Sequence, residues 1–159
     1  AAQQQCQALL AEQGYQQYEV SAYSKAGARC IHNLNYWQFG DYLGIGAGAH
    51  GKISRLLPNE IVRTVKSRSP EMYLSSQNNL SQALIDIAEL PLEFLMNQLR
   101  LKQGFSLTDY QAITGLEANT LEPALSEIVA EGLLIKEQQH YFCSETGWNF
   151  LDIILEKFV

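Results

Sequence analysis

Apolar residues recur at helical spacing through the second half of the chain. One stripe follows the i, i+3, i+4, i+7 pattern and predicts a helix that ends before Gly104. A second stripe predicts a helix with Thr120 as its N-cap, Pro123 at its third position and Gly132 as its left-handed stop. The first stripe is Leu92, Leu95, Met96 and Leu99, and the second is Leu121, Ala124, Leu125, Ile128 and Val129.

Two short β-forming runs follow, at 133–136 and 141–143, and the polar residues between them predict a hairpin. Ser144 is placed to cap a last helix. The apolar stripe of that helix is Trp148, Leu151, Leu155 and Phe158. The order helix, helix, hairpin, helix predicts a small winged-helix-like helical domain.

The first half is predicted to mix short strands with loops. A helix ends at Gly14, an alternating run at 18–23 predicts a strand, and 25–35 are expected to form a loop. The apolar run 42–46 predicts a buried strand that opens into a glycine-rich loop, and 61–67 predict a partly exposed strand. A further helix is expected to begin at Pro70 with Ser69 as its N-cap.

Composition indicates a globular protein. Of the 159 residues 47% are hydrophobic and 18% are charged, which is not the composition of a disordered chain. No run approaches the roughly 18 apolar residues of a membrane-spanning helix. We place a domain boundary in the polar stretch 75–84. The chain has no initiator Met and opens in what resembles the middle of a helix, so we expect a fragment of a longer protein.

The net charge of −6 is unevenly distributed. Residues 1–83 carry 7 basic and 5 acidic side chains, whereas 84–159 carry 4 and 12. The helix that would enter a DNA groove contains Glu122, Glu127 and Glu131 and no Lys or Arg. A phosphate backbone would repel it, so we expect no nucleic-acid partner.

Cysteine usage indicates a reducing compartment. The chain has an odd number of cysteines, Cys6, Cys30 and Cys143. They are widely spaced, and no two of them form a CxxC motif. They form neither a disulfide framework nor a zinc site, and a cytoplasmic location is the expectation.

The run Gly44-Ile-Gly46-Ala-Gly48-Ala49 matches the dinucleotide-binding pattern GxGxxG/A but not its context. A Rossmann site needs a helix directly after the glycines and an acid about 20 residues on. Here a strand-like stretch follows, and 64–69 hold no acid. Two interpretations remain open: a tight strand crossing, or a backbone cradle for a ligand at a strand end.

The densest polar and aromatic cluster is His32, Asn33, Tyr36 and Trp37. A histidine can ligate a metal or haem iron, and Tyr and Trp can flank a flat macrocycle. The alternative is structural: His32 and Asn33 cap a turn while the two aromatic side chains fill a groove. His50 is a second candidate, and His140, in the expected hairpin turn, is expected to be solvated.

Five basic residues between 52 and 68 face one acid, Glu60, which gives a local charge of +4. This cluster either attracts carboxylates such as porphyrin propionates or blunts a solvated strand edge. The five are Lys52, Arg55, Arg63, Lys66 and Arg68.

Three segments carry a family pattern: Tyr18-Glu-Val-Ser-Ala-Tyr-Ser-Lys25, Cys30-Ile-His-Asn-Leu-Asn-Tyr-Trp37 and Gly40-Asp-Tyr-Leu-Gly-Ile-Gly-Ala-Gly-Ala-His-Gly51. They resemble the C-terminal part of HemW proteins. These are the haem-chaperone relatives of oxygen-independent coproporphyrinogen III oxidase, in the radical S-adenosylmethionine superfamily. The resemblance continues through 93–100 and 115–116 to 144–147. One departure is Ala26, where many relatives have Pro.

The resemblance implies an α+β fold with two domains. Residues 1–78 would form the last strands of a partial (β/α) barrel, and 79–159 a HemN/HemW-type helical domain. It places S-adenosylmethionine against Gly46, Ala47, Gly48, Ala49 and His50, and haem near His32, Asn33, Tyr36 and Trp37. The CxxxCxxC motif that holds the family's 4Fe-4S cluster is missing from this sequence, and none of its three cysteines can replace it.

The family further implies a haem chaperone that passes haem to membrane haemoproteins. The alternative is a fragment of the oxidase, which decarboxylates coproporphyrinogen III propionates by radical chemistry. In either case we expect the fragment alone to perform no redox chemistry and none of the three cofactors to be fully bound by it. Unpaired edges of a truncated barrel would favour self-association, and we expect residues 1–57 to be held by a partner chain or to be poorly ordered rather than closed into a barrel.

Overall fold

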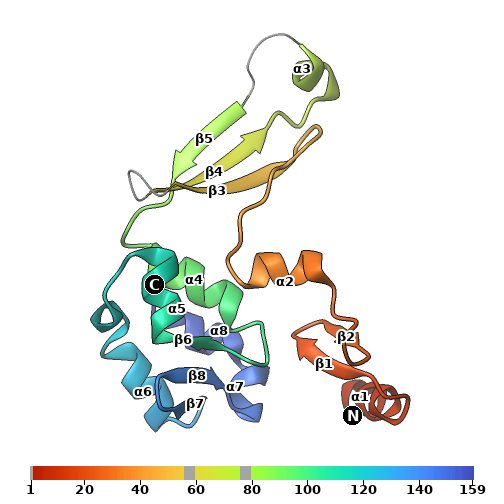
Figure 1. Ribbon diagram of the computed structural model, residues 1–159, viewed down its shortest axis with the longest axis vertical. Coiled ribbons are helices and arrows are strands. Elements are labelled where there is room, and N and C mark those ends of the chain that lie inside the picture. The colour runs from red at the N-terminus through yellow and green to blue at the C-terminus, as the bar shows by residue number, and fades with distance from the viewer. Residues whose placement is uncertain (1, 56–59, 76–79) are drawn as a thin grey trace. The chain divides into compact units, whose positions relative to one another are not determined.

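The computed structural model describes residues 2–55, 60–75 and 80–159 and separates into two compact units (Figure 1). One unit combines 1–39 with 91–159, and the other is 40–90. The predicted boundary between residues 78 and 79 falls in 76–79, outside the described residues. Both units contain helices and strands, so the mixed α and β class is confirmed.

The unit 40–90 is built on an antiparallel sheet of order β3-β4-β5. Ile61 and Val62 on the central strand are buried, and the predicted strand at 61–67 is confirmed as β4. The predicted helix begins at Pro70, where the Ser69 hydroxyl oxygen accepts a hydrogen bond of 3.3 Å from the backbone N–H of Met72. The elements are β3 (His50–Arg55), β4 (Glu60–Lys66), α3 (Pro70–Leu74) and β5 (Leu80–Leu84).

One prediction for this unit is wrong. Residues 42–46 form no buried strand, since within the run only Tyr42 makes a bridge and Leu43 and Ile45 are 78% and 86% exposed. The chain turns out of extended conformation at Gly46, whose φ is 110°. The stretch 75–84, in which the domain boundary was placed, includes a strand, because residues 80–84 pair with β4 as the exposed edge strand β5.

The N-terminal part of the other unit contains two helices and a hairpin, and the predicted helix end at Gly14 is confirmed. The single strand predicted at 18–23 is in fact two strands, because the chain reverses at 20–21. Residues 25–35, predicted as a loop, contain the start of a helix. The elements are α1 (Ala2–Glu12), β1 (Gln16–Glu19), β2 (Ala22–Ser24) and α2 (Ile31–Trp37).

An aromatic cluster fixes α2 to the C-terminal part of the same unit. Phe39, two residues after the end of α2, is 4% exposed, and its ring centroid lies 6.0 Å from that of Phe94. The Phe94 ring makes edge contacts with Phe105 at 5.4 Å and with Tyr110 at 5.1 Å. Burying rings of this size contributes about 1.5–3 kcal/mol each, so this cluster holds α2 where propensity alone would not.

Helices surround the three-stranded sheet β6-β8-β7 in the C-terminal part (Figure 1). The predicted hairpin is confirmed, and so are the left-handed stop at Gly132, with φ of 72°, and the Ser144 cap, whose Oγ accepts from Gly147 N at 3.0 Å. The elements are α4 (Leu90–Gln98), β6 (Phe105–Ser106), α5 (Leu107–Thr114), η1 (Ala118–Leu121), α6 (Ala124–Ala130), β7 (Leu134–Glu137), β8 (His140–Cys143), α7 (Glu145–Asn149) and α8 (Leu151–Glu156).

Two helix ends here differ from the prediction. Thr120 is not an N-cap, because its hydroxyl hydrogen-bonds with the Tyr110 hydroxyl at 2.6 Å and with the Glu117 carbonyl at 2.7 Å; α6 starts only at Ala124. The last helix is interrupted at Phe150, which separates α7 from α8. No helix in the described ranges is long and apolar enough to cross a lipid bilayer.

Candidate functional site

The predicted cluster of His32, Asn33, Tyr36 and Trp37 lies on α2, not in a loop. Consecutive residues of an α-helix are about 100° apart, so the four side chains cover an arc of about 140°. His32 and Tyr36 occupy one edge of this arc, and Asn33 and Trp37 the other. The helix therefore gathers the four predicted residues into one surface.

His32 is exposed, and its ring meets the Tyr36 ring edge-on at 4.8 Å. Its ring nitrogens make no hydrogen bond with any described residue. It does not cap the helix, whose N-cap is Cys30, so the structural alternative fails for this residue. The Cys30 N–H itself points to the Tyr18 hydroxyl at 3.4 Å. A neutral imidazole presented in this way can donate a nitrogen lone pair to a metal.

Trp37 is half-buried under a cation. The guanidinium carbon of Arg100 lies 4.3 Å from the centre of the indole ring. The indole Nε1 is buried and has no hydrogen-bond partner among the described residues. Leaving a buried N–H without an acceptor costs about 1–3 kcal/mol, so this N–H favours a hydrogen-bond acceptor beside it.

The glycine-rich segment forms a loop that hydrogen-bonds to its own unit. Gly48 N donates to Ser67 O at 2.7 Å, and Gly46 N donates to the Tyr73 hydroxyl at 3.1 Å. Ala49 N donates to the carbonyl of Gly46 at 3.2 Å. These three backbone N–H groups therefore already have hydrogen-bond acceptors within the unit. Within residues 46–50, Ala47 and His50 are exposed, and so are the ones that a ligand can reach.

Close backbone approach explains two neighbouring glycines. A Cβ at Gly44 would lie 2.1 Å from the carbonyl oxygen of His50, and one at Gly51 would lie 2.5 Å from the Thr64 hydroxyl. Both distances are far below van der Waals contact. This supports the tight-crossing interpretation of the glycine pattern for these two positions.

Two of the five clustered basic residues have acidic neighbours. The Lys52 ammonium, 4% exposed, lies 3.7 Å from Asp41, and Arg55 lies 3.6 Å from Glu60. Glu60 is already counted in the predicted local charge of +4, whereas Asp41 lowers the positive charge further.

The cysteines do not come together as a metal site. Cys6 and Cys30 are exposed, whereas Cys143 is half-buried and its thiol points to the Leu99 carbonyl at 3.8 Å. Burial raises the pKa of Cys143 to about 12. Within the described residues no three His, Cys, Asp or Glu side chains are grouped as metal ligands would be.

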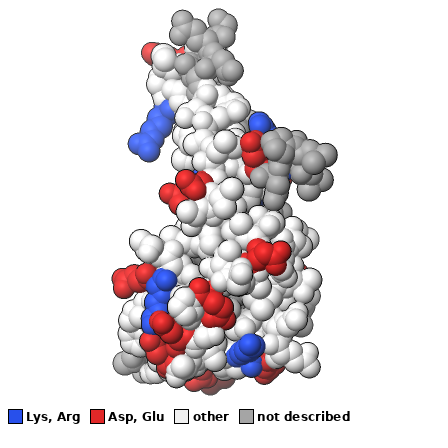
Figure 2. Space-filling view, turned by 90° about the vertical axis from the view of Figure 1, so that its left-hand side faces the viewer, with Lys and Arg blue, Asp and Glu red and all other residues white. Residues whose placement is uncertain are grey.

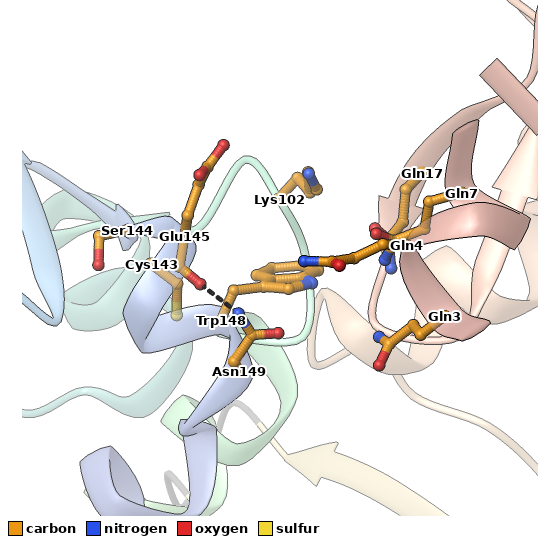
Figure 3. A pocket seen from close by; sticks show the side chains of 10 residues that line it. All are labelled: Gln3, Gln4, Gln7, Gln17, Lys102, Cys143, Ser144, Glu145, Trp148 and Asn149. Atoms are coloured by element: carbon orange, nitrogen blue, oxygen red, sulfur yellow. Dashed lines mark hydrogen bonds between the residues drawn. The ribbon is translucent and has the colours of Figure 1, made fainter. Parts of the chain in front are cut away.

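A polar pocket of about 390 Å³ was missed by the sequence analysis (Figure 3). Glutamine side chains from α1 and β1 line one side, and the Trp148 indole lies opposite with Lys102 Nζ 5.5 Å from its centre. The sequence analysis placed Trp148 in the apolar stripe of the last helix and gave the glutamines no role. Their spacing carries no signal that they meet. The pocket is lined by Gln3, Gln4, Gln7, Gln17, Lys102, Cys143, Ser144, Glu145, Trp148 and Asn149.

His140 is not the solvated bystander that the sequence suggested. It is only partly exposed, and its Nε2 is in hydrogen-bonding contact with the Gln103 carbonyl. The hairpin therefore uses this histidine to hold the turn that precedes β6.

Acidic side chains predominate around α6. Figure 2 shows carboxylates gathered with few basic side chains at the lower end of the view. Lys157 is held there by carboxylates, with Nζ 3.5 Å from Glu127 and a closer contact to Glu131. This surface suits neither DNA nor RNA phosphates.

Among solved structures, the fold is similar to that of a radical enzyme. Coproporphyrinogen III oxidase (HemN) of Escherichia coli, described as a radical SAM enzyme, matches with a TM-score of 0.69. The match covers 98% of this chain and 39% of the enzyme at 13% identity, which shows the fold alone. Residues 85–150 match the family model of the HemN C-terminal domain.

Among curated proteins, the chain is similar to proteins named as haem chaperones and to a mitochondrial radical S-adenosyl methionine domain-containing protein. Heme chaperone HemW of Escherichia coli is 42% identical over 95% of this chain and 40% of its own length. Heme chaperone HemW of Haemophilus influenzae is 38% identical over 95% of this chain and 39% of its own length. The mitochondrial radical S-adenosyl methionine domain-containing protein 1 of Bos taurus is 31% identical over 96% of this chain and 37% of its own length. The chain thus spans about 40% of the length of the curated relatives it matches. The resemblance to HemW-like proteins is confirmed.

Proposed function

We propose that this chain is the haem-binding, C-terminal part of a HemW-like haem chaperone. The observation that carries the proposal is the exposed imidazole of His32 on α2, free of any hydrogen bond with the described residues and beside Tyr36, in a chain 42% identical to a haem chaperone. A chaperone needs a ligand that can be both taken up and released. An exposed imidazole suits that purpose better than a buried one.

The residues of α2 fit haem as a cargo. His32 supplies a neutral nitrogen for the iron, and the edge contact with Tyr36 holds the ring in position. Trp37 offers an aromatic surface to the macrocycle, and Asn33 a hydrogen-bonding amide beside it. Each role uses the side chain as it lies in the structure.

Several features of the complete protein belong to the same proposal. The architecture is the end of a partial barrel, through residue 78, followed by a winged-helix-like domain from residue 79. S-adenosylmethionine would lie against Gly46–His50, where Ala47 and His50 are accessible, and a 4Fe-4S cluster would need cysteines from outside this sequence. Membrane haemoproteins in contact with the cytoplasm are the acceptors, and unpaired strand edges are where copies would associate.

Titration with hemin tests the proposal, because the chain has only three histidines. His32→Ala is expected to weaken hemin binding by about tenfold or more, the effect of losing about 1.4 kcal/mol, and to shift the Soret band. His50→Ala and His140→Ala are matched controls. Each should leave the hemin affinity and the Soret band unchanged. Equal affinity and an identical Soret band for His32→Ala would overturn the role of His32.

The competing function is oxidative decarboxylation of coproporphyrinogen III, the activity in the name of the structural neighbour. Only the fold supports it, since the identity is 13%. Vinyl-group formation by the anaerobic, cluster-reconstituted complete protein would establish it, and absence of product would reject it.

A further inference from the structure

Arg100 and Trp37 meet although 62 residues separate them in the sequence. Arg100 follows α4, in a segment whose backbone pairs with β1: Val20 N donates to Arg100 O at 3.0 Å and Lys102 N to Tyr18 O at 3.1 Å. Backbone pairing on this side and the burial of Phe39 on the other fix the two partners in one unit. The stacked pair is thus part of the fold.

The guanidinium of Arg100 has no acidic partner. It makes no hydrogen bond and no ion pair with any described residue, and its Nε is buried without an acceptor. The terminal nitrogens are not among the buried unpaired atoms, so the outer edge of the fork is accessible. Arg55, Lys52 and Lys157, in contrast, all lie near carboxylates.

Such an arrangement is typical of a binding group. A guanidinium stacked on an aromatic face is held by a cation–π interaction and has lost much of its rotational freedom in advance. Its free edge presents parallel N–H donors that match the two oxygens of a carboxylate. The chain carries a net charge of −6, so acidic side chains outnumber basic ones. Even so, no carboxylate of the described residues forms an ion pair with the Arg100 guanidinium.

We infer that Arg100 fixes the orientation of Trp37 and binds a carboxylate of the cargo, so that this surface selects a flat macrocycle with propionate side chains. The inference rests on the proposed function and adds to it a residue outside α2. It assigns iron and carboxylate to different residues: His32 takes the iron, and Arg100 takes a propionate.

Hemin and hemin dimethyl ester, whose propionates are esterified, separate these two roles. Arg100→Gln is expected to weaken hemin binding about tenfold or more while leaving ester binding unchanged. Arg100→Lys keeps the charge but loses the fork, and should lie between the wild type and Arg100→Gln. Lys102→Gln is the matched control, because it removes a cation 5.5 Å from the other tryptophan and should change neither affinity.

Iron-free protoporphyrin IX distinguishes failure of the inference from failure of the proposed function. His32→Ala should bind it like the wild type, whereas Arg100→Gln should bind it about tenfold more weakly. Fluorescence of Trp37 in a Trp148→Phe background, together with circular dichroism, checks that each variant is folded. Equal loss of hemin and ester affinity in Arg100→Gln, or no loss, overturns the carboxylate role alone. A wild-type chain that binds no porphyrin overturns both.

Discussion

At the scale of single residues, the three thiols should differ sharply in reactivity. Burial raises the pKa of Cys143 to about 12 from an ordinary value of 9.0, so its thiol stays protonated at pH 8, and only the thiolate reacts. We expect a disulfide reagent at pH 8 to modify Cys6 and Cys30 in the native chain and all three thiols in denaturant. The reagent's released chromophore measures the count.

Cys143→Ala provides the control for the thiol count, since it should lose only the thiol that appears on denaturation. Raising the pH should speed labelling of native Cys143 about tenfold per unit, because the thiolate fraction grows until the pKa is reached. Rapid labelling of three thiols in the native chain at pH 8 would show that Cys143 is accessible.

Local sequence signals were accurate for caps and failed for contacts between distant residues. Ser69, Ser144 and Gly132 were identified correctly, because a cap is decided by the few residues beside it. The N-cap predicted at Thr120 is wrong because the Thr120 hydroxyl hydrogen-bonds with the hydroxyl of Tyr110, ten positions earlier. No pattern could show that Arg100 covers Trp37.

At the scale of elements, two left-handed glycines form a matched pair. Gly104 and Gly132 have φ of 65° and 72°, so alanine is strained at both. At Gly104 a Cβ would also lie 2.0 Å from the Tyr141 carbonyl of β8, whereas at Gly132 it meets nothing within 4 Å. We expect Gly132→Ala to lower the free energy of unfolding by about 1 kcal/mol and Gly104→Ala by clearly more, since β6 must shift from β8.

Urea unfolding followed by circular dichroism measures both variants. Fluorescence of Trp148, next to β8 in the chain, should change in Gly104→Ala and stay constant in Gly132→Ala. Equal destabilisation by the two substitutions would mean that β6 and β8 are not packed as tightly as the structure has them.

The element most important for the site was also the one that the sequence did not predict. Residues 31–37 contain no apolar stripe and no capping side chain, so propensity gives no reason for a helix there. The buried Phe39 and the stacked Trp37 hold α2 against α4 and its following turn. The motif singled out His32, Asn33, Tyr36 and Trp37, but only the structure shows that they share one surface.

At the scale of the whole molecule, haem binding and iron–sulfur chemistry should be separable in this chain. The proposed haem site uses three side chains, His32, Trp37 and Arg100, that lie in one unit of this chain. A cubane cluster needs several thiolates at one place. This sequence has three cysteines, far apart in sequence, one of them with a pKa of about 12. We expect anaerobic treatment with ferrous iron and sulfide to leave no more iron on the desalted chain than on a variant with all three cysteines replaced by alanine.

The same preparation should still bind hemin, which shows that a negative iron result does not come from an unfolded chain. Cysteine replacement should leave hemin affinity unchanged, since neither His32 nor Arg100 depends on a thiol. Stoichiometric iron and sulfide on the wild type alone would mean that the chain assembles a cluster from cysteines the structure keeps apart. Hemin binding lost together with the cysteines would mean that a thiolate, and not His32, holds the iron.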